Sequence, residues 1–462
     1  MYMTLIKSIS GIRGTIGGKP SDNLTPFDIV IFVSAFASWL KSNLEIDHPK
    51  VAVGRDARIS GQMVHSIVNQ TLVGYGVEIF DLGLSTTPTV EMAVVKLNAN
   101  AGVMITASHN SKEWNALKFF DSNGEILNAK SVSEIINIAD NRDFSYSTID
   151  YLGKITIVED MVESHVNSIL ELSLVNRDLI KKSKFKVVLD AVNSTGGIAI
   201  PILLDRLGVE TVCLYCDPNG NFPHNPEPLE EHLSELSISV VKQSADFGIA
   251  VDPDVDRLAF VDEKGDYFGE EYTLVACSDY VLSQTKGNSV SNLSSTKALY
   301  DITKVHGGEY FSSAVGELNV IEKMKEKNAV IGGEGNGGVI YPDLHYGRDA
   351  LVGIALFLSF LAHKKLKVSS LRASYPNYFM SKTKVNLPAR TDFNKLLHKI
   401  ENKYKGENLI KIDGLKVEFE NSWAHIRKSN TEPIIRIYTE AVSQKDAKKL
   451  ATKFSDVIKT FI

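Results

Sequence analysis

The chain is poor in cysteine, carries no excess of positive charge and contains no long hydrophobic segment. Its three cysteines are an odd number in 462 residues, which argues against a disulfide framework of the kind found in small secreted proteins. The formal net charge of −6 offers no broad cationic surface for nucleic-acid phosphates, so a small anionic substrate must be met by a few local Arg and Lys residues. The longest nearly apolar run, Leu351 to Ala362, is about half as long as a membrane-spanning helix, and we expect a buried helix there.

These absences narrow the class of protein. The amino-terminal segment, Met1 to Gly14, has no apolar stretch long enough for a secretory signal, so we expect a cytoplasmic protein without nucleic-acid or membrane partners. A hydrophobic content of 44% is that of an ordinary globular protein, and at about 150 residues per domain the length suggests roughly three domains. The sequence does not indicate an oligomeric state.

Two of the cysteines, Cys213 and Cys216, have the C-x-x-C spacing of redox motifs and of half zinc sites. The segment from Val209 to Cys216 has the composition of a strand, however, and Cys277 lies far away in the sequence. Because a second cysteine pair is missing, a structural role is the preferred interpretation.

A similar succession of segments occurs three times along the chain. Each copy has a β-rich run, a helical segment, a second β-rich run, and a third run that leads into an unusual loop. The third runs are Gly102–Ile105, Phe247–Val251 and Ala329–Ile331. Strands alternating with helices predict α/β domains with mixed, mostly parallel sheets. Ligands of such sheets bind beyond the carboxyl ends of the strands, so the three loops are candidates for a shared site.

The carboxyl-terminal segment differs from the three copies. Residues 421–426 and 434–439 have the pattern of strands around a polar turn, and an amphipathic helix is expected from about Gln444. The predicted fold class is therefore α/β, with three similar α/β domains plus a C-terminal α+β domain. The expected domains are residues 1–149, 150–253, 254–367 and 368–462.

Three carboxylates at every other position, Asp252, Asp254 and Asp256, form the strongest chemical signal. An extended backbone places alternate side chains on one side, and hard divalent cations such as Mg²⁺ take oxygen ligands of this kind. An EF-hand is the competing interpretation, since Glu263 falls at the twelfth position, but Arg257 stands where that loop requires Gly. A solvated acidic turn is the other alternative. Three charges this close repel one another unless a cation lies among them.

Ser108, in the string Thr106-Ala107-Ser108-His109-Asn110, follows the first of the three loop-forming strands. No G-x-S-x-G elbow is present, and an isolated serine after a strand is most often a cap or a turn former. A serine that carries phosphate, next to a metal that stabilises the phosphate, would nevertheless form a phosphoryl-transfer centre.

Two further loops have polar or flexible composition suited to a ligand. The segment 427–433, followed by Arg436, joins cations with hydroxyl, amide and backbone donors, which is what a dianionic phosphate requires, although a plain hairpin turn has similar composition. The segment Gly332–Gly338 surrounds Glu334 and Asn336 with glycines that allow close approach of a ligand. It lacks the pattern of a nucleotide-binding loop.

With these four motifs in order, the chain resembles the α-D-phosphohexomutases over essentially its whole length. Thr106–Asn110 is similar to the family's phosphoserine loop, Asp252–Arg257 to its metal loop, and the loops at 333–338 and 427–436 to its sugar and phosphate loops. The resemblance implies a heart-shaped, four-domain isomerase of carbohydrate metabolism with one central active site. Phosphoserine would donate its phosphoryl group to a hexose phosphate, and the resulting bisphosphate would turn around and return the other phosphate.

The resemblance also implies a role for each matching residue. Ser108 would carry the phosphoryl group and, together with Asp252, Asp254 and Asp256, would hold one Mg²⁺. The cationic, proton-handling group would be Arg13, Lys118 and Arg257. Glu334 and Asn336 would bind sugar hydroxyls. The phosphate that is not reacting would be held by Arg427, Ser429, Asn430, Thr431 and Arg436.

The chain departs from the family pattern at two positions. Ser111 stands where many relatives have Pro, which changes loop rigidity. Gly338 stands where some bacterial mutases have a His that shuttles protons, and His109 is a possible substitute, although it could equally only orient the loop.

Substrate preference is predicted from the sugar loop and the segment that follows it. The loop with Val339-Ile340-Tyr341-Pro342 is similar to the archaeal-type branch of phosphoglucosamine mutases, so we expect interconversion of glucosamine 6-phosphate and glucosamine 1-phosphate. Glucose or glucosamine 1,6-bisphosphate would be the intermediate or activator. The alternative is a phosphomannomutase or phosphoglucomutase of relaxed specificity. More distant alternatives are a metal-dependent phosphatase and a non-catalytic sugar-phosphate sensor.

Overall fold

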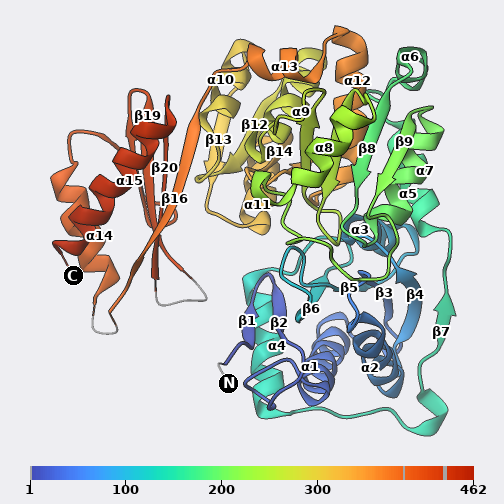
Figure 1. Cartoon of the computed structure of the whole chain (residues 1–462). Helices are drawn as coiled ribbons and strands as arrows, with labels where there is room; N and C mark the ends of the chain where they lie inside the picture. The colour runs from blue at the N-terminus through green and yellow to red at the C-terminus, as the bar shows by residue number, and fades with distance from the viewer. Residues whose placement is uncertain (1–2, 389–390, 430–433, 462) are drawn as a thin grey trace. The chain divides into compact units, whose positions relative to one another are not determined.

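The structure is a computed structural model that describes residues 3–388, 391–429 and 434–461. The chain forms two compact units (Figure 1). The first combines Met1–Thr273 with Asn336–Ser369, and the second combines Leu274–Gly335 with Ser370–Ile462.

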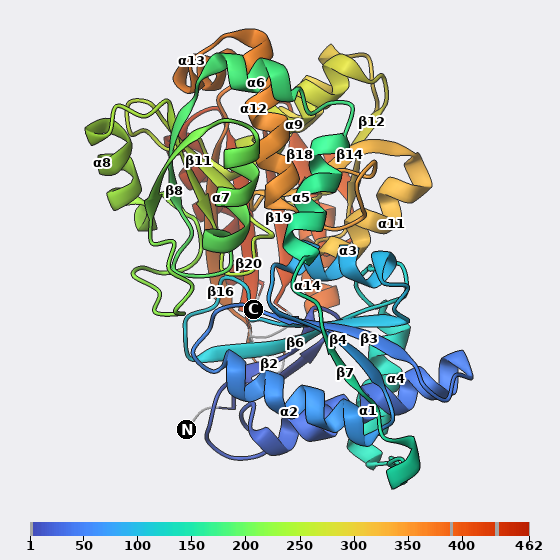
Figure 2. The same ribbon diagram turned by 90° about the vertical axis from the view of Figure 1, so that its right-hand side faces the viewer.

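The amino-terminal part of the first unit is built around a mixed seven-stranded sheet. In spatial order its strands are β1 (Ile6–Ser8), β2 (Gly11–Thr15), β6 (Trp114–Phe120), β5 (Ala101–Ile105), β3 (Lys50–Arg55), β4 (Glu78–Leu84) and β7 (Ile155–Ile157). Helices α1 (Pro26–Leu44), α2 (Gly61–Gly74) and α4 (Ala129–Asn141) pack on one face, and α3 (Thr87–Lys96) packs on the other (Figure 2). The central strands β5, β3 and β4 run parallel, so their carboxyl ends share one edge.

Helix α1 is the one helix of the described chain that is long and apolar enough to cross a membrane by length and composition. It starts with a capping box at Thr25 and Asp28, and it contacts α2 and α4. Its side chains Phe32, Val33 and Phe36 belong to the hydrophobic core of the sheet. These contacts are those of a core helix.

A second sheet follows within the first unit. In spatial order its strands are β11 (Leu258–Asp262), β10 (Phe247–Val251), β8 (Lys186–Asp190) and β9 (Glu210–Leu214), of which only β11 is antiparallel. The helices of this part are α5 (Met161–Glu171), α6 (Arg177–Ser183), α7 (Gly196–Arg206) and α8 (Ser234–Lys242), with short 3₁₀ turns η1 (Ile149–Tyr151) and η2 (Glu230–His232). The strands β5 and β10 confirm the first two predicted loop-forming strands. All three cysteines are free thiols.

The buried helix expected around Leu351–Ala362 is present as α12 (Ala350–Lys364), next to the short strand β15 (Gly338–Ile340). Residues 350–362 of α12 are all buried. Phe357 stacks on Phe260 of β11 with ring centroids 3.9 Å apart, and it meets Phe247 and Phe268 edge-on. This aromatic cluster fixes α12 against the second sheet.

The second unit contains residues 274–335 of the predicted third domain, whose other residues belong to the first unit, and the carboxyl-terminal domain. Parallel strands β13 (Tyr310–Ser313), β12 (Asn288–Asn292) and β14 (Ala329–Glu334) are accompanied by α10 (Lys297–Val305) and α11 (Glu317–Lys327). Helices α9 (Glu270–Gln284) and α13 (Val368–Ser374) contain points where the chain passes from one unit to the other. The strand β14 confirms the third predicted loop-forming strand.

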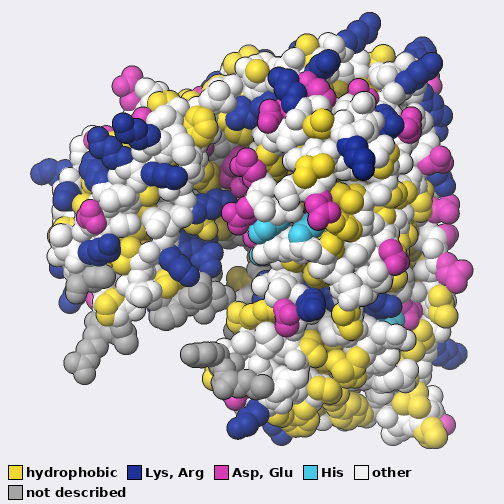
Figure 3. Space-filling model, viewed as in Figure 1, with side chains coloured by type: hydrophobic (Ala, Val, Ile, Leu, Met, Phe, Trp, Pro, Cys, Tyr) yellow, Lys and Arg dark blue, Asp and Glu magenta, His cyan; other side chains and the backbone are white. Residues whose placement is uncertain are grey.

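The carboxyl-terminal domain has the predicted α+β architecture. Its antiparallel sheet has the order β16 (Phe379–Asn386), β20 (Ile434–Ala441), β19 (Ser422–Lys428), β18 (Leu415–Phe419), β17 (Asn408–Ile410). Helices α14 (Phe393–Lys403) and α15 (Gln444–Lys459) supply the other half of its core. On the face shown in Figure 3, Lys and Arg side chains gather over this domain.

We expect Phe357→Ala to destabilise the protein by about 3–5 kcal/mol, because a fully buried ring would be replaced by a cavity. The free energy of unfolding is measured by urea denaturation followed by circular dichroism. Ile238→Ala is the control, since Ile238 is 66% exposed and its loss should change stability by less than about 0.5 kcal/mol. Equal effects of the two substitutions would contradict a core role for α12.

Candidate active site

Ser108 lies in a tightly held turn directly after β5. Its backbone is left-handed, with φ of +50°, which is uncommon for a residue other than Gly. Its amide donates to the hydroxyl of Thr106 at 2.9 Å, and that hydroxyl donates to Asp56 at 2.7 Å. The turn therefore presents the Ser108 side chain in one fixed direction.

A buried ion pair between Asp56 and Arg58 also holds this turn. The two side chains are 3.0 Å apart, and the Arg58 guanidinium donates to the backbone carbonyls of Ser108, Asn110, Ser111 and Trp114. Sequence reasoning did not assign these two residues a role. The available signal was the string Arg55-Asp56-Ala57-Arg58 at the carboxyl end of a predicted strand, where charged residues often serve a site.

The three aspartates lie directly after β10 and are almost completely buried. One oxygen of each lies within 4.8 Å of the others. The Ser108 hydroxyl donates to Asp252 at 2.7 Å, so the two loops that the sequence suggested as partners are in contact. Between the second and third carboxylates, Val255 has φ of +64°, an outlier for a β-branched residue that its surroundings must hold in place.

Cations and hydroxyl groups surround the carboxylates. Lys118 on β6 contacts Asp254 at 2.6 Å and Asp256 at 3.4 Å, and Arg348 contacts Asp256 at 2.7 Å. The hydroxyl of Thr87, the first residue of α3, donates to Asp254 at 2.6 Å. Lys118 was among the predicted site residues, whereas Arg348 and Thr87 were not, because they belong to none of the four motifs.

The pKa values of Asp252 and Asp256 are shifted in opposite directions. Burial, with Asp256 and Asp254 nearby, raises the pKa of Asp252 well above its ordinary value. Burial acts in the same direction on Asp256, but Arg348, Lys118 and Arg257 outweigh it and lower the pKa of Asp256. Although burial opposes its charge, Asp254 and Asp256 raise the pKa of Lys118, so this ammonium is charged at neutral pH.

The donor set fits a hard divalent cation. Buried oxygens Asp254 Oδ1 and Asp256 Oδ1 have no hydrogen-bond partner within the described chain, and Asp252 Oδ2 is bonded only to the Ser108 hydroxyl. An unpaired buried carboxylate oxygen is costly, and a cation among them removes that cost. Carboxylate oxygens are the ligands that Mg²⁺ takes in proteins.

The remaining predicted residues of the first unit have different partners. Arg13 donates to Asn110 at 3.0 Å, and Arg257 pairs with Glu227 at 2.8 Å while its Nε lies 4.0 Å from Asp256 Oδ1. His109 Nδ1 lies 3.3 Å from the Ser108 hydroxyl. Burial and the neighbouring Arg257 and Arg13 lower the pKa of His109 well below its ordinary value, so its ring is neutral at neutral pH.

The sugar loop is divided between the two units. Asn336 in the first unit accepts the Gly338 amide at 3.2 Å. In the second unit, Glu334 ends β14 and accepts hydrogen bonds from Asn292 at 2.8 Å and from the Gly316 amide at 3.2 Å. These bonds fix the direction of its carboxylate.

The predicted phosphate loop joins β19 and β20 in the second unit. Arg427 and Arg436 are cross-strand partners, and Arg427 pairs with Asp413 at 3.6 Å. Ser429 is buried, and its amide donates to Ile434 at 3.0 Å. Asn430 and Thr431 lie outside the described residues.

Comparison with known proteins identifies the family. Models described as Phosphoglucomutase/phosphomannomutase match along the whole chain: alpha/beta/alpha domain I at residues 5–146, domain II at 163–265, domain III at 269–378, and the C-terminal domain at 383–457. A phosphoglucomutase/phosphomannomutase from Thermococcus kodakarensis is 34% identical, covering 94% of this chain and 96% of the relative.

Two further matches agree. A probable phosphoglucosamine mutase from Methanopyrus kandleri is 32% identical over 97% of each chain. The crystal structure of a phosphoglucomutase/phosphomannomutase family protein from Burkholderia thailandensis aligns with a TM-score of 0.85 at 26% identity, covering 100% of this chain and 98% of that one. The resemblance carried by the four motifs is thereby confirmed, as is the predicted fold class: the protein belongs to the α-D-phosphohexomutases, a family of isomerases.

Proposed function

We propose that the protein interconverts the 6-phosphate and the 1-phosphate of a hexosamine through a phosphorylated Ser108. The carrying observation is the contact of 2.7 Å between the Ser108 hydroxyl and Asp252, inside a group of buried carboxylates with unpaired oxygens. In the first half-reaction a sugar hydroxyl loses its proton as its oxygen forms a new P–O bond, the P–O bond of phosphoserine breaks, and the Ser108 oxygen takes up a proton, giving the 1,6-bisphosphate. In the second, Ser108 takes the other phosphoryl group, and the leaving sugar oxygen receives a proton.

Mg²⁺ would be held by Asp252, Asp254, Asp256 and one oxygen of phospho-Ser108. When bound, it would spread the negative charge of the transferring group. The chain's own contribution is to hold the ligands: Lys118 fixes Asp254, and the left-handed turns at Ser108 and Val255 aim the hydroxyl and the carboxylates at one another. Fixed groups of this kind supply most of the rate in phosphoryl transfer.

Proton transfer is assigned among the four predicted groups by their charge. The raised pKa of Lys118 keeps it protonated, and guanidinium groups such as Arg13 and Arg257 do not release a proton in this range. His109 is neutral and 3.3 Å from the reacting hydroxyl, so it is our candidate for accepting the Ser108 proton and returning it. Lys118, Arg13 and Arg257 would then act as cations that hold the phosphoryl group.

We assign binding of the unreactive phosphate to the 427–436 turn. A single fixed anchor would let either end of the sugar reach Ser108. The residues assigned to it are Arg427, Ser429, Asn430, Thr431 and Arg436. Glu334 and Asn336 are assigned to the sugar itself.

Glucosamine is the proposed sugar. The names of the relatives differ, since one is called a phosphoglucomutase/phosphomannomutase and the other a probable phosphoglucosamine mutase. Glu334 favours the amino sugar, because a carboxylate held by two hydrogen bonds is a suitable acceptor for the ammonium group on the second carbon.

Intact-mass measurement of the purified protein should reveal a fraction that carries one added phosphoryl group. Ser108→Ala should remove that mass and lower kcat by about 10³-fold or more, because the group that stores the phosphate is lost. Ser111→Ala, three residues further along the same loop, is the matched control and should keep both. Release of inorganic phosphate without isomerised sugar would show a phosphatase instead.

Magnesium should raise the midpoint of thermal unfolding, because it binds the folded carboxylate site and not the unfolded chain. At a hundredfold excess over Kd the stabilisation is about 2.7 kcal/mol. Asp256→Asn should abolish the shift and the activity, and a chelator should abolish the activity of the unmodified protein. Asp246→Asn, at the opposite end of β10, serves as control, and loss of the shift in that variant would speak against the assigned site.

Glucosamine 6-phosphate should have a kcat/KM about tenfold or more above those of mannose and glucose 6-phosphates, since hydrogen bonds to charged groups contribute roughly 1.5–3 kcal/mol. Glu334→Gln should lower the value for glucosamine and leave the value for mannose nearly unchanged. Asn319→Ala, at a polar residue of the neighbouring helix α11, is the control. A tenfold preference for mannose phosphate would favour the alternative assignment as a phosphomannomutase/phosphoglucomutase.

A further inference from the structure

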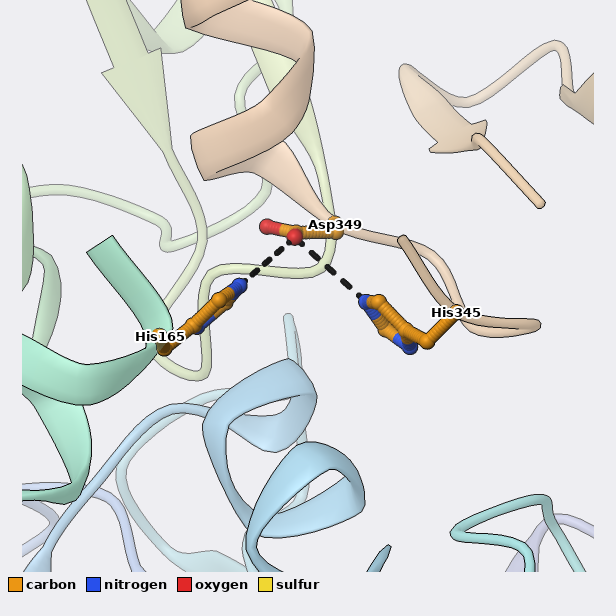
Figure 4. A group of neighbouring side chains, drawn as sticks. All are labelled: His165, His345 and Asp349. Atoms are coloured by element: carbon orange, nitrogen blue, oxygen red, sulfur yellow. Dashed lines mark hydrogen bonds and ion pairs between the residues drawn. The ribbon is translucent and has the colours of Figure 1, made fainter. Parts of the chain in front are cut away.

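A buried polar cluster lies in the first unit, outside the groups discussed so far. It consists of Glu91, His165, His345 and Asp349, which we call the histidine cluster. Figure 4 shows the two imidazole rings directed at the same carboxylate oxygen of Asp349. His165 Nε2 is 2.9 Å and His345 Nε2 is 3.4 Å from that oxygen.

Of the other two ring nitrogens, that of His165 makes a hydrogen bond, whereas that of His345 faces a carboxylate without a hydrogen bond in the described chain. His165 Nδ1 is hydrogen-bonded to the Thr89 hydroxyl at 2.9 Å, and His345 Nδ1 lies 3.3 Å from the Glu91 carboxylate. The second oxygen of Asp349 caps α12 by accepting the amides of Leu351 and Val352. Burial opposes a charge on His345, but Asp349 and Glu91 outweigh it and raise its pKa to about 10. The His345 ring thus lies between two carboxylates, with Glu91 facing one ring nitrogen and Asp349 the other.

The cluster lies between two segments, α3 and residues 345–350, and each of them makes hydrogen bonds to the metal loop. Helix α3, which carries Glu91, contacts Asp254 twice through Thr87: the hydroxyl binds the carboxylate at 2.6 Å, and the amide binds the backbone carbonyl at 2.9 Å. The 345–350 segment contacts the loop at its other half. Arg348 binds the Asp256 carboxylate at 2.7 Å, and the Ala350 amide binds the Val255 carbonyl at 3.1 Å.

The contact between α3 and the 345–350 segment, which we call the joint, is closely packed. A Cβ atom at Gly347 would lie 1.9 Å from the Glu91 carboxylate, so only Gly allows the 345–350 segment to approach α3 this closely. The bonds to the Asp254 and Val255 carbonyls hold the backbone on both sides of the Val255 peptide, where the conformation is left-handed. Such a conformation persists only if its surroundings over-determine it.

We propose that His345 and Glu91 are positioning residues for the metal loop: by tying α3 to the 345–350 segment, they keep Asp254 and Asp256 at the geometry that Mg²⁺ requires. Arg348 and Thr87 transmit this restraint to the carboxylates. The inference rests on the proposed function, in that the aspartates are taken as the Mg²⁺ ligands. Mg²⁺ demands near-ideal octahedral geometry, so a loosened loop should cost affinity rather than merely stability.

The test compares His345→Gln, Glu91→Gln and the double variant in the full-length protein. Either single change should raise the Mg²⁺ concentration for half-maximal activity by about 10- to 100-fold, the usual cost of losing an outer partner of a metal site. The KM for the sugar phosphate at saturating Mg²⁺ should not change. Because both substitutions break the same joint, the double variant should be little worse than the worse single one.

His65→Gln is the matched control, since His65 also pairs with a carboxylate, Asp81, at 2.9 Å, but on α2 and β4. It should leave the Mg²⁺ dependence unchanged. Glu91→Gln keeps the bond from His345 to Asp349 and tests the inference even if His345→Gln does not fold. Unchanged Mg²⁺ dependence in a folded Glu91→Gln protein would overturn the inference, as would additive single effects.

Elemental analysis of the purified protein shows whether the histidine cluster binds a metal ion or is held by contacts among its own side chains. Two histidines and a carboxylate can also hold a metal ion. Stoichiometric zinc that is lost in His345→Gln would overturn the inference. Calorimetric titration with Mg²⁺ needs no turnover, so it tests the joint even if the unmodified protein has no mutase activity, a result that would refute the proposed function alone.

Discussion

Mutual repulsion among three buried carboxylates is the constraint on which the rest of the structure depends. Burying one unpaired carboxylate costs several kcal/mol, and Asp252, Asp254 and Asp256 lie within reach of one another in a space closed to water. The protein balances this with Lys118 and Arg348, and with backbone amides at Asp256 and Arg257 that bind Asp252. The compensation stops short of Asp254 Oδ1 and Asp256 Oδ1, which make no hydrogen bond within the described chain.

Sheet geometry explains how residues 144 positions apart meet at 2.7 Å. Strands β5 and β10 belong to different sheets, yet each is flanked by a parallel neighbour and ends in a turn with a left-handed residue, Ser108 in one and Val255 in the other. Strain in both turns is held by side chains from outside them, Arg58 for the first and the α3 and 345–350 segments for the second. The site is thus rigid because other elements enforce conformations that its own residues disfavour.

The sequence predicted the features that lie within one short segment. It did not predict the contacts that form only when distant segments pack together. A carboxylate triplet, a serine after an apolar run and a buried apolar helix are readable within a dozen residues, and the structure places all three as expected. Arg348 and Thr87 carry no motif of their own, because their roles come from packing α12 and α3 against the metal loop. For the same reason the pairing of Arg257 with Glu227 could not be foreseen, nor could the addition of β1, β2 and β7 to the first sheet.

The glycine at position 338 links the family pattern to this site. The resemblance to the family implies that some bacterial mutases have a His at this position, where this chain has Gly. A Cβ atom at Gly338 would lie 2.4 Å from Cδ of Arg348, so a side chain at this position would require the Arg348 side chain to shift from where it binds Asp256. The two residues are therefore coupled. The aliphatic part of the Arg348 side chain takes the space beside Gly338, and its guanidinium binds Asp256.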